Sequence, residues 1–144
     1  MAEMKQYTGT KIVNATPMTR QAYNDLRGWD LPADEEGSDK GYLVEYVDGG
    51  KSNHQDYAGY ISWSPKDVFE KSYLPSSHPL DRMAIENMQL IERLKQLDEL
   101  IAKPQPKFIS DKQWALLHEQ QKHMTAYFNT LDERIEDLAA ELGL

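Results

Sequence analysis

The chain has 144 residues, enough for one ordinary domain or two very small ones, and its 40% hydrophobic and 28% charged content is typical of a folded protein. It contains no cysteine, which excludes disulfides and thiolate metal sites. The formal net charge is −8, and neither half is basic, which argues against DNA or RNA as a partner because such binding depends on clustered lysine and arginine.

The N-terminal part, residues 1–75, is predicted to form a small β-rich unit. A first strand is expected over residues 7–15, and the following Thr16-Pro17 interrupts it. A short helix should follow over residues 19–26 and close at Gly28, since glycine is the usual residue at a helix C-terminus.

Two further strands and a short helix are predicted after an acidic loop at residues 31–39. The strands cover residues 41–47 and 57–63, which show alternating patterns, and a long polar hairpin loop joins them. Ser64 would cap the helix and Pro65 would open it. The first residues lack the apolar run of a secretory signal, and no segment approaches the roughly 18 apolar residues of a membrane span. We therefore expect a cytoplasmic protein without a membrane partner.

The C-terminal part, residues 76–144, is predicted to be a long antiparallel two-helix hairpin. Two heptad seams are separated by a proline-rich stretch at residues 103–109, and Ser110 with Gln113 forms a capping-box pattern that starts the second helix. The seam positions are Met83, Asn87, Leu90, Leu94, Leu97 and Ile101 on the first helix, and Trp114, Leu117, Gln121, Met124, Phe128, Leu131, Ile135, Leu138 and Leu142 on the second. The whole chain is therefore expected to be α+β.

A second apolar stripe adds Met88 and Ile91 on the first helix and Leu116 and Tyr127 on the second. Two helices cannot bury two stripes between them. We expect the extra stripe to meet the N-terminal unit, another copy of the chain, or both, which predicts a homo-oligomer that this hairpin helps to build.

Patterns with catalytic or metal-binding potential are incomplete. Gly50-Lys51-Ser52 lacks the upstream glycine and the following helix of a phosphate-binding loop. His118 and His123 are five residues apart, which places their rings about 140° apart on a helix and not on one face. Paired carboxylates on the last helix fit a solvated face. We therefore expect no catalytic residue, no metal and no cofactor.

Four residues of the hairpin are candidates for ligand binding. Asn87 and Gln121 interrupt the apolar seams, either as amides that fix the register of the helices or as groups that recognise a base edge or a ribose. Folding the hairpin places Arg82 near the level of Arg134, where two guanidinium groups could clamp a phosphate or could pair with neighbouring carboxylates.

Aromatic residues supply the remaining candidates. Tyr127, beside the two arginines, could stack on a base or belong to the core. In the N-terminal unit, Tyr60 and Trp63 of the last strand would suit a nucleotide if they are displayed beside Lys66, although ordinary sheet packing explains them equally well.

The hairpin resembles the C-terminal hairpin domain of phage anti-defence nucleotide sponges, namely the Thoeris anti-defence family and the related anti-CBASS sponge. The resemblance rests on Asp81-Arg82-Met83, Glu86, Leu90 to Leu97, Leu100-Ile101, Phe108, Leu117, Met124, Ala126-Tyr127, Leu131 and Glu133-Arg134-Ile135. The N-terminal stretch also resembles a module of small phage ligand-binding proteins, through Lys11-Ile12-Val13, Pro17-Met18-Thr19, Tyr23, Arg27-Gly28-Trp29, Gly41 to Val44 and Gly59 to Pro65.

The resemblance implies a homo-oligomer, hexameric in the family, that works in the host cytoplasm. It would bind cyclic ADP-ribose isomers, and in a second class of pocket cyclic di- or trinucleotides, without cleaving them. Arg82 and Arg134 lie in the matching helical runs, and Met124 and Tyr127 lie in the run with the most specific spacing. Asn87 departs from the charged residue expected there.

Two other functions remain open. The chain could be a non-catalytic oligomeric scaffold whose N-terminal unit tethers a protein partner, or a weak enzyme acting on cyclic nucleotides. The sponge predicts ligand recovered intact, the scaffold predicts indifference to nucleotides, and the enzyme predicts ligand converted to products.

Overall fold

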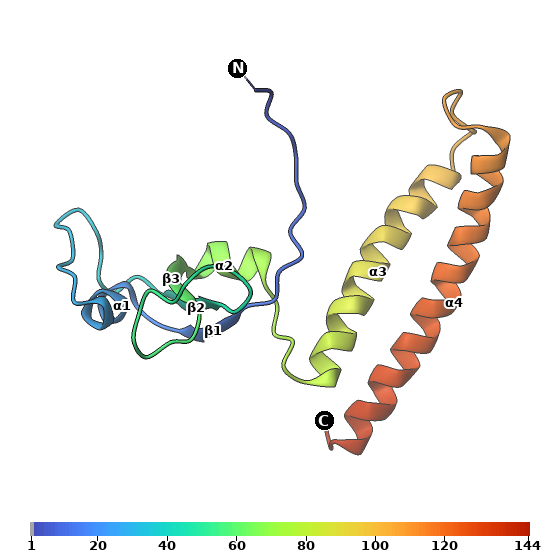
Figure 1. Cartoon of the computed structure of the whole chain (residues 1–144). Coiled ribbons are helices and arrows are strands. Elements are labelled where there is room, and N and C mark those ends of the chain that lie inside the picture. Colours follow the sequence, from blue (N-terminus) through green and yellow to red (C-terminus); the bar gives the residue numbers. More distant parts are fainter. Residues whose placement is uncertain (1) are drawn as a thin grey trace. The chain divides into compact units, whose positions relative to one another are not determined.

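A computed structural model describes residues 2–144 and has an α+β fold, as expected. The chain divides into two compact units, Met1–Tyr73 and Leu74–Leu144. Each unit is taken by itself below (Figure 1).

The first unit contains a three-stranded antiparallel sheet in the order β1-β2-β3. The strands are β1 (Asn14–Pro17), β2 (Gly41–Tyr46) and β3 (Tyr60–Pro65). In the register of the sheet, Leu43 lies opposite Thr16 on one side and Trp63 on the other. Its core is formed by Tyr23, Leu43 and Ile61, with Met18, Leu26, Tyr57 and Trp63 packed against them.

Helix α1 (Arg20–Arg27) follows β1, lies one residue later at each end than the predicted range 19–26, and closes at Gly28 as expected. Thr19 caps its start by accepting a hydrogen bond on Oγ1 from the backbone N–H of Ala22, 3.2 Å away. Gly28 ends it with φ of 70°, a left-handed conformation that glycine adopts without strain. The helix therefore presents Tyr23 to the sheet at a fixed position.

Several local predictions for this unit are wrong, among them the start of the last strand, because β3 begins at Tyr60 and not at residue 57. The first strand does not cover residues 7–15 but begins at Asn14, because only residues 14–17 find pairing partners on β2. Pro17 lies inside this strand, which is tolerated because β1 is an edge strand. Ser64 and Pro65 likewise belong to β3 and do not open a helix. The pairing of the sheet runs through Ser64, which lies opposite Tyr42.

Helix α2 (Lys66–Ser72) starts only after β3 has ended. Its capping position is Pro65, without a side-chain hydrogen bond. Phe69 of this helix stacks on Tyr42 of the sheet, with ring centres 4.2 Å apart, and the Tyr42 hydroxyl donates a hydrogen bond to Glu70 at 2.8 Å. These contacts attach α2 to β2.

The second unit consists of α3 (Pro79–Ile101) and α4 (Asp111–Glu141), called the helix pair below. Figure 1 shows the two helices side by side, joined by a short connection at one end. Pro79 occupies the first turn of α3, and Ser110 caps α4 by accepting from the backbone N–H of Gln113 at 3.2 Å. Met83, Leu94, Leu97 and Leu131 are the buried apolar residues between the helices.

The second apolar stripe remains on the outside of the helix pair. Met88, Ile91, Leu116 and Tyr127 are all exposed, with Leu116 47% exposed. Leu142, which follows the last residue of α4, is also exposed. No helix of residues 2–144 is both long and apolar enough to cross a membrane.

Candidate ligand-binding surface on the last helix

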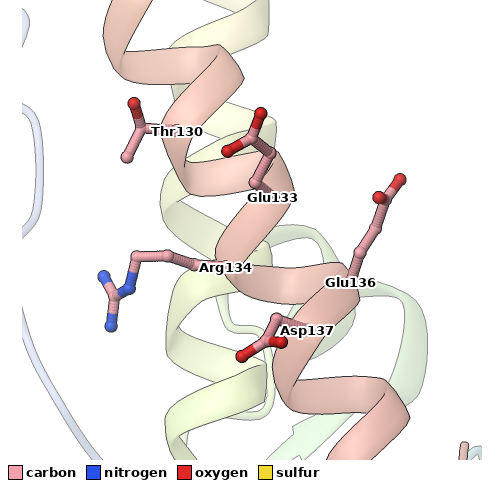
Figure 2. Close-up of a pocket in the computed structure, with 5 residues that line it drawn as sticks. All are labelled: Thr130, Glu133, Arg134, Glu136 and Asp137. Carbon is pink, nitrogen blue, oxygen red and sulfur yellow. The ribbon is translucent and has the colours of Figure 1, made fainter.

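Two open depressions lie on the surface of α4, and both are formed by residues of this helix alone. The first is lined by Thr130, Glu133, Arg134, Glu136 and Asp137 (Figure 2). The second is lined by Leu116, Glu119, Gln120, His123, Met124 and Tyr127. Positions separated by three, four and seven residues line up along one side of a helix, which explains why each set shares a surface.

The first depression combines one guanidinium group with three carboxylates. Arg134 forms no ion pair within residues 2–144, although Glu133 is its neighbour in the chain. Figure 2 shows its side chain extending from α4 on the other side from Glu136. The guanidinium is thus free to donate to an anionic ligand, while the surrounding carboxylates would oppose a highly charged one.

The second depression has a mainly apolar lining and contains two of the predicted site residues, Met124 and Tyr127. Tyr127 donates a hydrogen bond from its hydroxyl to Glu86 of α3, which ties the ring to the neighbouring helix. His123 lies 3.1 Å from a carboxylate oxygen of Glu119. A flat apolar group could rest on this surface against the Tyr127 ring, with polar atoms at its edge.

Arg82 has a different role from Arg134 in the structure. Its Nη1 atom donates to the backbone carbonyls of Ser76 and Ser77, at 3.0 and 3.1 Å. These bonds hold the segment that leads into α3. Arg82 does not line the depression that contains Arg134, so the structure does not bring the two predicted arginines together in one site.

The two seam amides also differ from each other. Gln121 donates from Nε2 to the carboxylate of Asp98 on α3 at 2.7 Å, and so joins the two helices. The Oδ1 atom of Asn87 is buried and has no hydrogen-bond partner. Gln121 therefore has a structural partner, whereas Asn87 keeps an unsatisfied acceptor.

The three predicted site residues of the first unit, Tyr60, Trp63 and Lys66, line neither of the two depressions. Trp63 is held in place, because its indole N–H donates to the Met18 carbonyl at 2.8 Å and Arg20 covers its ring at 5.1 Å. Tyr60 is exposed at the start of β3, and Lys66 is exposed at the start of α2. Trp63 thus packs as part of the sheet, which is one of the two roles that the sequence left open.

Several lining residues were not predicted to contact a ligand, among them Thr130 and Gln120, and Glu119 and Glu136 were considered only for metal-binding or acid–base patterns. The available signal was their helical spacing from Arg134 and Tyr127. Composition could not separate them from an ordinary solvated helix face. Among residues 2–144 there is no group of three or more histidine, aspartate or glutamate side chains placed to hold a metal ion.

Residues 77–137 match the model of the Sequestin family. The matched stretch contains all of α3 and most of α4, including every residue that lines the two depressions. The name of the family indicates a sequestering role, which is consistent with the resemblance to anti-defence sponges. No curated protein and no solved structure gave a significant match to the chain.

Proposed function

We propose that the protein is a non-catalytic anti-defence protein that sequesters cyclic nucleotide immune signals, foremost cyclic ADP-ribose isomers and also cyclic di- or trinucleotides. The observation that carries this proposal is the coincidence of the Sequestin match with the helix pair that holds both depressions. Sequestration demands tight, stoichiometric binding and no turnover, so the site needs recognition groups only.

The chemistry of α4 supports a ligand with an anionic and a planar part. Arg134 offers charge-assisted hydrogen bonds to a phosphate, and the apolar depression beside Tyr127 offers a surface for a base. Both depressions are shallow on a single chain. Copies of the chain that assemble through the second apolar stripe would enclose them and bring several arginines around one ligand, which favours a homo-oligomer, hexameric by analogy with the sponges.

Native mass spectrometry tests the proposal directly. The purified full chain is measured alone, with glycocyclic ADP-ribose and with a cyclic triadenylate, and the ligand is then released by denaturation. We expect an oligomer that takes up at least one signal and returns it at unchanged mass.

Three other outcomes contradict the proposal in different ways. Ligand released as a cleavage product indicates an enzyme. An oligomer that binds neither nucleotide favours the scaffold hypothesis, in which the chain tethers a protein partner. A monomer contradicts the role given to the second apolar stripe.

A further inference from the structure

The loop between β2 and β3 contributes one side chain to the free edge of the sheet. Asn53, eight residues before Ile61, donates from Nδ2 to the Ile61 carbonyl at 2.9 Å. Its Oδ1 atom accepts the backbone N–H of the same residue at 2.7 Å. The amide of Asn53 thus pairs with Ile61 as the backbone of a neighbouring strand would, through one donor and one acceptor.

These two bonds lie on the side of β3 that faces away from β2. The strand order is β1-β2-β3, so β3 is an edge strand of the sheet that the described residues form. Successive residues of a strand direct their backbone groups alternately to one side and to the other. Because the groups of Ile61 point to Asn53, the outward-facing residues of β3 are Ile61, Trp63 and Pro65.

Few backbone donors remain open along this edge. The amide of Asn53 takes the N–H of Ile61, and Pro65 has no N–H to offer. In β3, all of whose residues the structure describes, the N–H of Trp63 is the one outward-facing donor left. One donor is too few for a ladder of hydrogen bonds with another strand.

The opposite edge of the sheet needs less protection. β1 has four residues, against six in β3, and it includes Pro17. Short edge strands and proline both discourage pairing with another chain. The longer edge is therefore the one that carries the additional amide.

The residues next to Asn53 hold its side chain at the edge. Ser52 donates from Oγ to the carbonyl of His54 at 2.7 Å. The Nδ1 atom of His54 accepts the backbone N–H of Asp56 at 3.1 Å, so the ring proton is on Nε2, which donates to the Leu26 carbonyl of α1 at 3.2 Å. Ser52 and His54, on either side of Asn53, thus fix the loop locally and attach it to α1.

We propose that residues 51–57, called the edge loop below, are a built-in cover that stops the first unit from pairing edge to edge with a second copy of the chain. Asn53 closes the edge, and Ser52 and His54 position it. Without the Asn53 amide, two β3 strands could pair antiparallel about a two-fold axis, through the outward-facing groups of Ile61 and Trp63. With the amide in place, self-association of the chain is left to other surfaces.

Asn53→Ala in the full chain tests the proposal, and Gln55→Ala, at an exposed position of the same loop, is the matched control. Amide hydrogen exchange follows the Ile61 N–H, and sedimentation velocity detects assemblies larger than those of the wild type. In dilute Asn53→Ala, we expect the Ile61 amide to exchange at least about tenfold faster than in the wild type, because its acceptor is lost. At high concentration, this variant should form a larger assembly and its exchange should slow again. Gln55→Ala should behave as the wild type at both concentrations.

A second variant separates closure of the edge from stability of the loop. Asn53→Asp removes the donor to the Ile61 carbonyl but places a carboxylate at the edge, so that two copies would bring like charges together. We expect this variant to be less stable than the wild type and yet to form no larger assembly. If Asn53→Ala does not fold by circular dichroism, Asn53→Ser, whose shorter side chain cannot bond both groups, replaces it.

Three results would overturn the proposal. The first is faster exchange in Asn53→Ala without concentration-dependent assembly, which would make Asn53 a stabilising residue of the loop only. The second is an Ile61 amide that exchanges equally fast in the variant and in the wild type. The third is assembly of Asn53→Asp to the same extent as Asn53→Ala. Capture of cyclic nucleotides by the helix pair should not change in these variants, so this proposal and the proposed function fail separately.

Discussion

Gln121 of α4 and Asp98 of α3 are joined by a hydrogen bond of 2.7 Å that crosses the helix pair. Tyr127 of α4 and Glu86 of α3 form a second such bond farther along. Because residue numbers rise on one helix as they fall on the other, these two bonds fix an antiparallel register. The amide at position 121 is thus explained by helix pairing, one of the two roles that a polar seam residue can have.

Replacing Gln121 should weaken the helix pair modestly. We expect Gln121→Ala to lower the free energy of unfolding by about 1 kcal/mol, since Asp98 is exposed and water replaces part of the bond. Urea denaturation of Gln121→Ala, Asp98→Ala and the double variant measures the coupling between them. Lys122→Ala, an exposed neighbour, is the control. A coupling energy of zero would show that the bond does not set the register.

Substitutions of Leu131 and Leu116 should distinguish effects on folding stability from effects on self-association, because one side chain is buried and the other is exposed on the same helix. Leu131 is 2% exposed and Leu116 is 47% exposed. Leu131→Ala should lower the free energy of unfolding by about 2–5 kcal/mol through lost burial and a cavity. Leu116→Ala should leave the folded chain intact but weaken self-association, as measured by analytical ultracentrifugation. Equal effects of the two variants on stability would contradict this division.

The elements that the sequence predicted well are those with local signals. Thr19 and Gly28 bounded α1 correctly, and Pro79, Ser110 and Gln113 bounded the two long helices, because caps act within one turn. Strand ends depend on distant partners, so neither the start of β1 at Asn14 nor the end of β3 at Pro65 could be predicted from nearby residues.

The candidate site was likewise predictable only where local sequence signals determine it. The spacing of Arg134, Met124 and Tyr127 placed them on one helix, and the structure gives each a place in a depression. The role of Arg82 could not be predicted, because its hydrogen bonds go to backbone carbonyls, which every sequence offers. Trp114, which the heptad pattern places in the seam, is only partly buried.

Asn87 offers a test of whether stability is given up for binding. Its buried Oδ1 has no partner, and such an atom destabilises a fold by about 1–3 kcal/mol. We therefore expect Asn87→Leu to raise the free energy of unfolding and to reduce ligand capture in native mass spectrometry. Asn129→Leu, at an exposed position of α4, is the control. If Asn87→Leu is more stable and binds as well as the wild type, Asn87 does not contribute to ligand binding.

Arg134 should control the capture of phosphate-bearing ligands. Arg134→Gln removes the one cation of the first depression and leaves Glu133, Glu136 and Asp137 around it. We expect a loss of affinity of at least about a hundredfold, as one or two charged hydrogen bonds disappear and the carboxylates repel the ligand. Isothermal titration calorimetry measures the affinity, and Arg93→Gln is the matched control. Unchanged affinity with an intact oligomer would exclude Arg134 from the site.

The first unit should lose stability in alkali through Tyr23. Burial raises the pKa of this phenol, although Arg27 and Arg20 act in the opposite direction. The folded chain therefore keeps the Tyr23 proton at pH values where the unfolded chain, with an ordinary tyrosine pKa of about 10, releases it. The unfolded state then binds fewer protons, so the free energy of unfolding falls as pH rises above about 10.

Tyr42 should also lower the free energy of unfolding in alkali, because its hydrogen bond to Glu70 raises the pKa of the phenol. Urea titrations of the wild type, Tyr23→Phe, Tyr42→Phe and the double variant, at equal protein concentration and increasing pH, separate the two contributions. Each single variant should flatten the alkaline decline, and the double variant should flatten it most. A wild-type stability that stays constant through this range would show that neither phenol is held protonated by the fold.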